Sequence, residues 1–149
     1  MSGSLDNSPS QIVANLLVDL DVGTDYSLSG SWPVYYSGEP DTPDNLIVVY
    51  DVPSIKSGRF QYNGEVQEHH GLLIKVRSTN HATGYAKARA IAIALDENVN
   101  LAGITINSNV YKVYAVSRTS DVISLGKDHN TNNLNLFTID VVASIRQTT

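Results

Sequence analysis

Residues 71–95, GLLIKVRSTNHATGYAKARAIAIAL, decide the fold, because a strand pattern there runs directly into a helix pattern. Over residues 72–77, apolar side chains alternate with a second set that includes Lys75 and Arg77, and this period of two predicts a strand with one solvated face. From Ala82 onward, apolar side chains recur at helical spacing. The predicted buried positions of this helix are Tyr85, Ala88, Ile91, Ala92 and Leu95. The stretch therefore predicts a helix that packs closely on a sheet.

The chain before this stretch predicts a helix and several strands. Ser8, Pro9 and Gln11 form a capping arrangement with proline at the first helical position, and the apolar spacing that follows predicts a helix over residues 9–20. Strands are predicted at residues 32–36 and 46–52, a turn at 53–58 and an edge strand at 59–67. The second of these strands is almost entirely apolar at its start, which is typical of a central strand covered on both faces.

The chain after this stretch predicts further strands. They are expected at residues 104–107, 110–117 and 134–146, with turns at 96–100 and 107–109, a segment at 122–125 that continues or pairs again, and a polar tip at 126–133. At about 3.3 Å per residue the last strand would be about 40 Å long, so we expect part of it to project or to bulge. The whole order predicts an α+β fold, with a mixed, mainly antiparallel sheet on which the N-terminal helix and the second helix pack.

Length and charge narrow the class of protein. The 149 residues fit one domain, residues 1–149, of which residues 1–7 are expected to be disordered. Without cysteine, neither a disulfide framework nor a thiolate zinc site can form. The net charge of −5 and the scattered lysines and arginines disfavour tight binding to phosphates. No apolar run approaches the roughly 20 residues of a membrane span, so we expect no membrane partner.

The motifs of common enzymes are missing from the sequence. There is neither a Gly-x-Ser-x-Gly elbow nor a Gly-rich phosphate loop. Glu68, His69 and His70 adjoin, but neighbouring strand residues point to opposite faces, so only Glu68 and His70 could share an ion. An exposed entry to the strand is the better interpretation. We therefore expect no catalytic residues, no metal and no cofactor.

Three other groups of residues have ordinary structural explanations. Asp41, Asp44, Asp51 and Glu39 are interpreted as loop-forming acids. Tyr111 and Tyr114 favour sheet packing or a protein interface over base stacking, because arginines are not interleaved with them. The basic residues near the organising helix are interpreted as a solvated face; they are Lys75, Arg77, Lys87 and Arg89.

Taken together, four segments carry a resemblance to a known family. They are the capped helix at residues 8–20, the sheet residues 46–51, the strand–helix unit LLIKVR to YAKA within residues 72–88, and the late strand LFTIDV at 136–141. In their order and in total length, the chain resembles the tail-terminator proteins of long-tailed bacteriophages, also called tail-completion or minor capsid proteins. The departures from that pattern are the long loop at residues 38–45 and the Asn-rich tip.

The resemblance implies a structural function in the virion, with assembly in the host cytoplasm. Copies of the chain would form a ring, typically of six, which caps the tail tube, ends its polymerisation and offers a docking surface to the head connector. The ring would carry about thirty negative charges, so DNA would pass through the lumen without specific binding.

Two polar loops, residues 57–68 and 121–133, are the predicted contacts with the tube or the next subunit. The candidate interaction residues are Arg59, Gln61, Tyr62, Glu65, Asp121, Lys127, Asp128, His129 and Asn130. Two alternatives stay open at this stage: another head–tail neck or completion protein, and a small α+β ligand-binding module, which would need a concave site with converging polar groups.

Overall fold

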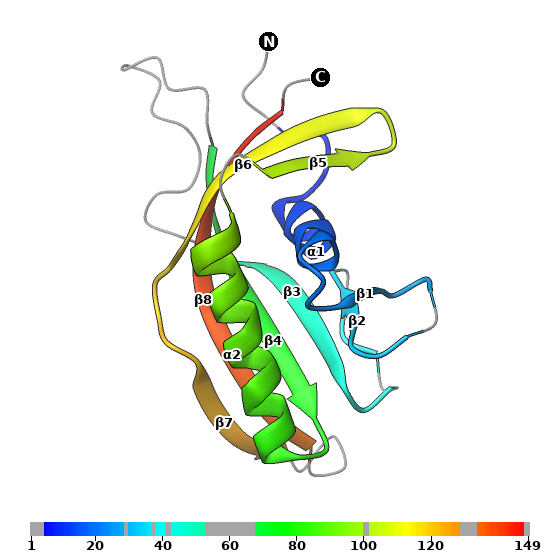
Figure 1. Cartoon of the computed structure of the whole chain (residues 1–149), viewed down its shortest axis with the longest axis vertical. Helices are drawn as coiled ribbons and strands as arrows, with labels where there is room; N and C mark the ends of the chain where they lie inside the picture. Colours follow the sequence, from blue (N-terminus) through cyan, green and yellow to red (C-terminus); the bar gives the residue numbers. More distant parts are fainter. Residues whose placement is uncertain are drawn as a thin grey trace.

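The computed structural model describes residues 5–28, 30–36, 38–40, 43–52, 68–99, 102–128 and 134–147. Two helices lie on one face of a mixed, mainly antiparallel sheet, which confirms the predicted α+β fold (Figure 1). The elements are α1 (Pro9–Asp19), β1 (Thr24–Asp25), β2 (Pro33–Tyr35), β3 (Leu46–Val52), β4 (Glu68–Ser78), α2 (His81–Asn98), β5 (Ala102–Ile106), β6 (Asn109–Arg118), β7 (Ile123–Asp128) and β8 (Leu134–Gln147).

The strand order is β1-β2-β3-β4-β8-β6-β5. Strand β6 pairs with the C-terminal half of β8, and β7 pairs with the N-terminal part of β8 on the same edge. The long strand β8 therefore has β4 along one edge and β6 followed by β7 along the other. We expected part of β8 to project or to bulge, but the register shifts lie in its partners, in β6 between Val113 and Ala115 and in β7 between Ser124 and Gly126. Pairing on both edges allows a strand of this length.

The core lies between the sheet and the two helices. Its sheet side includes alternate residues of β3, β4 and β8, and those of β4 are Leu72, Ile74 and Val76, as the period of two predicted. In α2, Ala88, Ile91, Ala92 and Leu95 are buried as predicted, whereas Tyr85 is 45% exposed. Tyr85 lies at the border of the buried stripe, where its ring still contacts the ring of Phe137 edge-on.

The helix α2 lies close to β8 because its first turn contains a glycine. A Cβ placed on Gly84 would lie 2.6 Å from a ring carbon of Phe137 and 2.9 Å from Cβ of Ser78. Asn80 begins the helix, and its side chain accepts a hydrogen bond from the backbone N–H of Thr83. The cap and the close approach fix the helix over the centre of the sheet.

Several predicted boundaries were wrong. α2 continues to Asn98 through the turn expected at 96–100, and β7 includes residues 126–128, which were expected to belong to the polar tip. Before α1, the backbone N–H of Asn7 donates to the hydroxyl of Tyr111 and that of Asp6 donates to Gln147. The turn at 53–58 and the edge strand at 59–67 lie outside the described residues.

The sheet face opposite the helices is not simply solvated, contrary to the sequence interpretation. Arg77 is only 1% exposed, and its guanidinium donates to Glu39 at 2.8 Å and to the carbonyl of Pro43 at 2.7 Å. Lys75 forms a second ion pair with Glu39 at 2.7 Å. The segment that carries Glu39 therefore folds back over β4 and satisfies charges on that face.

Candidate interaction surfaces

The predicted interaction residues fall into three groups. Arg59, Gln61, Tyr62, Glu65, His129 and Asn130 lie outside the described residues. Asp121 lies in the bend between β6 and β7, and Lys127 lies on β7 with its side chain exposed. Asp128 is the last residue of β7. Of the two predicted loops, the structure describes only Glu68 of the first, as the first residue of β4, and residues 121–128 of the second, which lie along one edge of the sheet.

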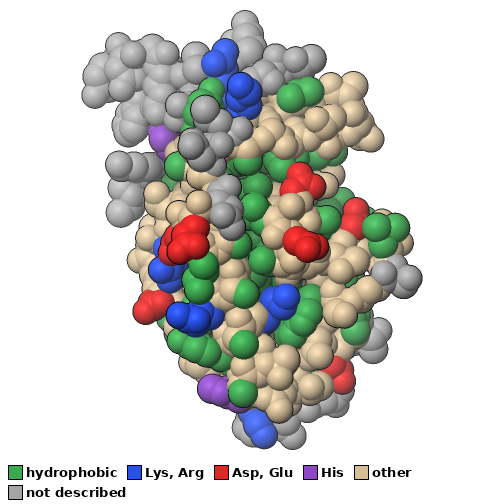
Figure 2. All heavy atoms as spheres, viewed as in Figure 1, with side chains coloured by type: hydrophobic (Ala, Val, Ile, Leu, Met, Phe, Trp, Pro, Cys, Tyr) green, Lys and Arg blue, Asp and Glu red, His purple; other side chains and the backbone are tan. Residues whose placement is uncertain are grey.

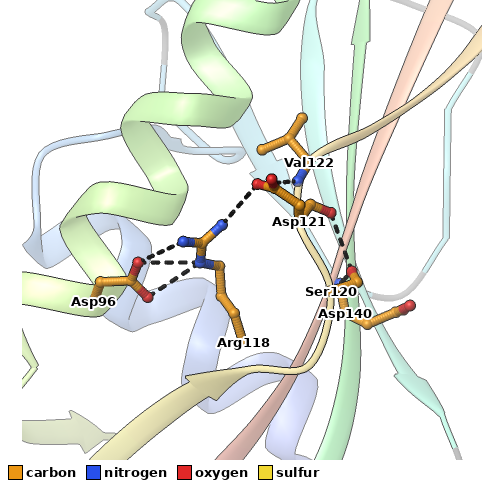
Figure 3. A network of polar contacts seen from close by, with 6 residues as sticks. All are labelled: Asp96, Arg118, Ser120, Asp121, Val122 and Asp140. Atoms are coloured by element: carbon orange, nitrogen blue, oxygen red, sulfur yellow. Dashed lines mark hydrogen bonds and ion pairs between the residues drawn. The ribbon is translucent and has the colours of Figure 1, made fainter.

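The bend between β6 and β7 is held by polar contacts (Figure 3). Arg118 forms ion pairs with Asp96 of α2 at 2.8 Å and with Asp121 at 3.2 Å. Asp121 also accepts a hydrogen bond from the backbone N–H of Val122 at 2.9 Å. On the other side of the bend, the Ser120 hydroxyl accepts a hydrogen bond from the backbone N–H of Asp140 at 3.1 Å, where strand pairing is interrupted. These contacts direct β7 back onto β8.

The edge formed by β7 carries exposed apolar side chains. Ile123 is 44% exposed and Leu125 is 56% exposed, and among the described residues β7 pairs only with β8. We call Ile123, Leu125 and the neighbouring Lys127 the β7 patch. Sequence reasoning missed its apolar part, because an apolar residue in a strand pattern is normally assigned to the core.

A second exposed apolar group lies at the opposite end of the sheet, after β1. Tyr26 is 47% exposed and Leu28 is 65% exposed. The ring of Tyr26 lies 5.4 Å from that of Tyr35 and 5.8 Å from that of Tyr36. A hydrogen bond with Tyr26 raises the pKa of Tyr36, and burial adds to this increase. We call Tyr26 and Leu28, with the adjacent Asp25, the β1 patch.

The acidic residues that were interpreted as loop-forming have more specific contacts. The carboxylate of Asp51, in β3, accepts hydrogen bonds from the backbone N–H and the hydroxyl of Ser10 in the first turn of α1. Burial alone would raise the pKa of Glu39, but the hydrogen bonds and charges of Lys75 and Arg77 outweigh it and lower that pKa. Asp41 lies outside the described residues.

The remaining basic and aromatic candidates are also mostly structural. Lys87 lies over the ring of Trp32, 5.4 Å from its centroid, and donates to the carbonyl of Val22. Burial lowers the pKa of Lys87, although the charge of Asp21 opposes this effect. Tyr111 is fully buried, so it packs in the core as one of the two sequence interpretations held. On the face seen in Figure 2, acidic and basic side chains are interspersed with apolar ones.

Two open depressions on the surface have volumes of about 270 and 480 Å³. The first lies between α1 and β5 and includes Asp25, Tyr26 and Tyr36, while the second lies between Trp32 and the alanine-rich face of α2. Within the described ranges, no three His, Asp or Glu side chains gather as metal ligands would, and His69 instead contacts the Ser144 hydroxyl at 2.9 Å. Neither helix of the described chain has the length and apolarity of a membrane span.

Comparison with known protein families shows to which class of protein this chain belongs. The model of a family described as bacteriophage tail terminator protein matches residues 15–145, which include every helix and strand at least in part. The chain therefore belongs to the bacteriophage tail terminator family and is a structural component of the phage tail.

Comparisons with curated proteins and with solved structures do not extend this family assignment. No curated protein matched the chain. One solved structure is similar to this chain with 15% sequence identity and a TM-score of 0.49, over 93% of this chain and 96% of the solved chain.

Proposed function

We propose that copies of this chain form a ring of six that caps the tail tube, ends its polymerisation and provides the docking surface for the head connector. The match of the tail-terminator family model over residues 15–145 carries this proposal. The protein acts by binding other virion proteins, without catalysing a reaction and without a cofactor. Assembly takes place in the host cytoplasm.

The charge of the chain is consistent with a ring through which DNA passes. Six copies with a net charge of −5 each would carry about thirty negative charges, and those that line the lumen would repel phosphates. The lysines and arginines that would favour phosphate binding are partly engaged within the chain, since Lys75, Arg77 and Arg118 all form ion pairs with carboxylates. The ring would therefore let DNA slide instead of holding it.

The two loops at residues 57–68 and 121–133 are the proposed contacts with the tube or the adjoining subunit. The second loop begins at the Arg118–Asp121 ion pair and continues along the exposed edge of β7. Polar groups at an exposed strand edge can pair with another chain. Among the proposed contact residues on β7, Lys127 has an exposed side chain, so its substitution is a simple test of this contact.

A tube-growth assay tests the proposed function. Purified tail tube protein would be polymerised with and without this chain, and tube lengths would be measured by electron microscopy. We expect growth to stop at the length reached when the chain is added, with extra density at one tube end. Tubes that grow equally long in both samples would contradict the proposal. Binding to filled heads but not to tubes would favour the alternative of a head-completion protein.

A further inference from the structure

Among the described residues, four of the six exposed large hydrophobic side chains form two pairs at opposite sides of the molecule. The large hydrophobic side chains that are clearly exposed are Tyr26, Leu28, Tyr85, Ile93, Ile123 and Leu125. Tyr26 and Leu28 follow β1 on one side, and Ile123 and Leu125 lie in β7 on the other (Figure 1). Exposed apolar groups of this kind are common at sites where another protein binds.

The sheet register places the two pairs at the ends of the same row of residues. Across the sheet, the aligned residues are Asp25, Val34, Ile47, Val76, Phe137 and Ser124. Six strands at a spacing of about 4.8 Å put β1 and β7 about 24 Å apart. In the part of the chain that the structure describes, each of these two strands pairs on one edge only.

The directions of the strands would also allow the sheet of one copy to continue into the sheet of the next copy. β1 and β2 run parallel to β3, which is antiparallel to β4, and the direction alternates again at β8 and at β7. β7 therefore runs opposite to β1. If the sheet of one copy continued into the next, β7 would lie antiparallel to the neighbouring β1, the more common and slightly more stable arrangement.

The charges beside the two pairs have opposite signs. Lys127 follows Leu125 on β7, while Asp25 precedes Tyr26, and the exposed Asp21 lies nearby in the chain. Beside the β7 patch, Asp121 is already paired with Arg118, and Asp128 directly follows Lys127 in the chain. Pairing β7 with β7 of another copy would instead leave Tyr26 and Leu28 exposed.

We propose that the β7 patch of one copy docks on the β1 patch of the next copy, so that Ile123 and Leu125 cover Tyr26 and Leu28. The inference rests on the proposed ring and names the two surfaces that close it. Because the surfaces differ and lie at opposite ends of one sheet row, the contact is head to tail, the kind of contact from which a closed ring is built, and not the contact of a two-fold dimer.

Two complementary variants test this inference. Leu125→Asp removes the β7 half of the contact and keeps the β1 half, while Leu28→Asp does the reverse. Both side chains are more than half exposed, so each variant should keep the wild-type melting temperature. By native mass spectrometry, each variant alone should be monomeric. An equal mixture should give dimers and nothing larger, because one intact junction can form between the two variants.

A control variant and two contrary outcomes complete the test. Ile93→Asp changes another exposed apolar residue, on α2, and should leave the ring intact. If the wild type forms rings and both patch variants still do so, the assigned surfaces are wrong although the proposed ring stands. If the wild type stays monomeric both in solution and at the ends of tail tubes, the proposed ring fails and this inference fails with it.

Discussion

At the scale of single residues, Glu39 contributes most to the unexpected part of the fold. It forms ion pairs with Lys75 and Arg77, and the hydroxyl of Tyr50 donates to it at 3.3 Å. Loss of a carboxylate partner is costly for a buried guanidinium, so Glu39 helps to hold the segment before β3 against β4.

Replacing Glu39 with Gln should destabilise the protein by about 3 kcal/mol near neutral pH, because the buried Arg77 loses its ion pair with Glu39. The folded state lowers the pKa of Glu39, so its contribution is present above the ordinary carboxyl pKa and is lost as the pH falls through the lowered value. The difference between wild type and variant in urea unfolding should therefore shrink below about pH 4.

The matched control is Asp44→Asn. Arg77 contacts the backbone carbonyl of Asp44, which the substitution keeps, and the side chain is exposed. We expect a change within about 0.5 kcal/mol. Equal losses for the two variants, or a Glu39→Gln loss that stays constant down to pH 3, would contradict the role assigned to Glu39.

Gly84 is a second residue with a testable role. Alanine at this position gains up to about 1 kcal/mol in helix propensity, but its Cβ would lie 2.6 Å from the ring of Phe137. Overpacking of this kind costs about 1–3 kcal/mol, so Gly84→Ala should lower the free energy of unfolding. Gly103→Ala, where an added Cβ meets nothing within 4 Å, is the control and should be neutral or slightly stabilising. A stabilised Gly84→Ala variant would show that α2 can move away from the sheet.

At the scale of elements, the bend between β6 and β7 decides where the exposed edge lies. The Ser120 hydroxyl replaces a missing strand partner of the Asp140 N–H, and the backbone N–H of Thr119 donates to the Asp140 carbonyl at 2.9 Å. Four residues separate β6 from β7. Because residues of this bend bind the backbone of Asp140, that edge of β8 keeps hydrogen-bond partners between β6 and β7.

Ser120→Ala should destabilise the protein by about 1 kcal/mol, because the Asp140 N–H loses its acceptor. Hydrogen exchange measured by NMR should show faster exchange at the Asp140 amide than in the wild type. Ser124→Ala, at an exposed position of β7, should change neither quantity. Unchanged exchange at Asp140 in the Ser120 variant would mean that another group holds the bend.

The elements also show what the sequence can predict. Local patterns gave β3 its bounds of 46–52 and placed α1 within one residue, because the apolar spacing and the capping residues lie inside each segment. They missed residues 126–128 of β7, because a Gly-Lys-Asp segment becomes a strand only through its distant partner β8. The burial of Arg77 was missed for the same reason, since Glu39 lies 38 positions away in the chain.

The candidate surfaces were predicted only in part. Polarity pointed to Asp121 and Lys127, and the structure places both on the exposed bend and edge. The apolar half of each surface left no recognisable pattern, because Ile123, Leu125 and Leu28 resemble core residues until the sheet order shows that nothing described pairs beyond them. Exposure at a sheet edge is a property of topology, not of local sequence.

At the scale of the whole molecule, we propose that this chain is one segment of a ring at the end of the phage tail. In a closed ring built from one head-to-tail contact, every subunit uses both of its contact surfaces, one toward each neighbour. End-on electron microscopy of tail tubes capped with the purified chain tests this most directly. We expect class averages with a closed ring of six equal subunits, in which no subunit is related to its neighbour by a two-fold axis. Two-fold dimers, or tube ends without any ring, would contradict it.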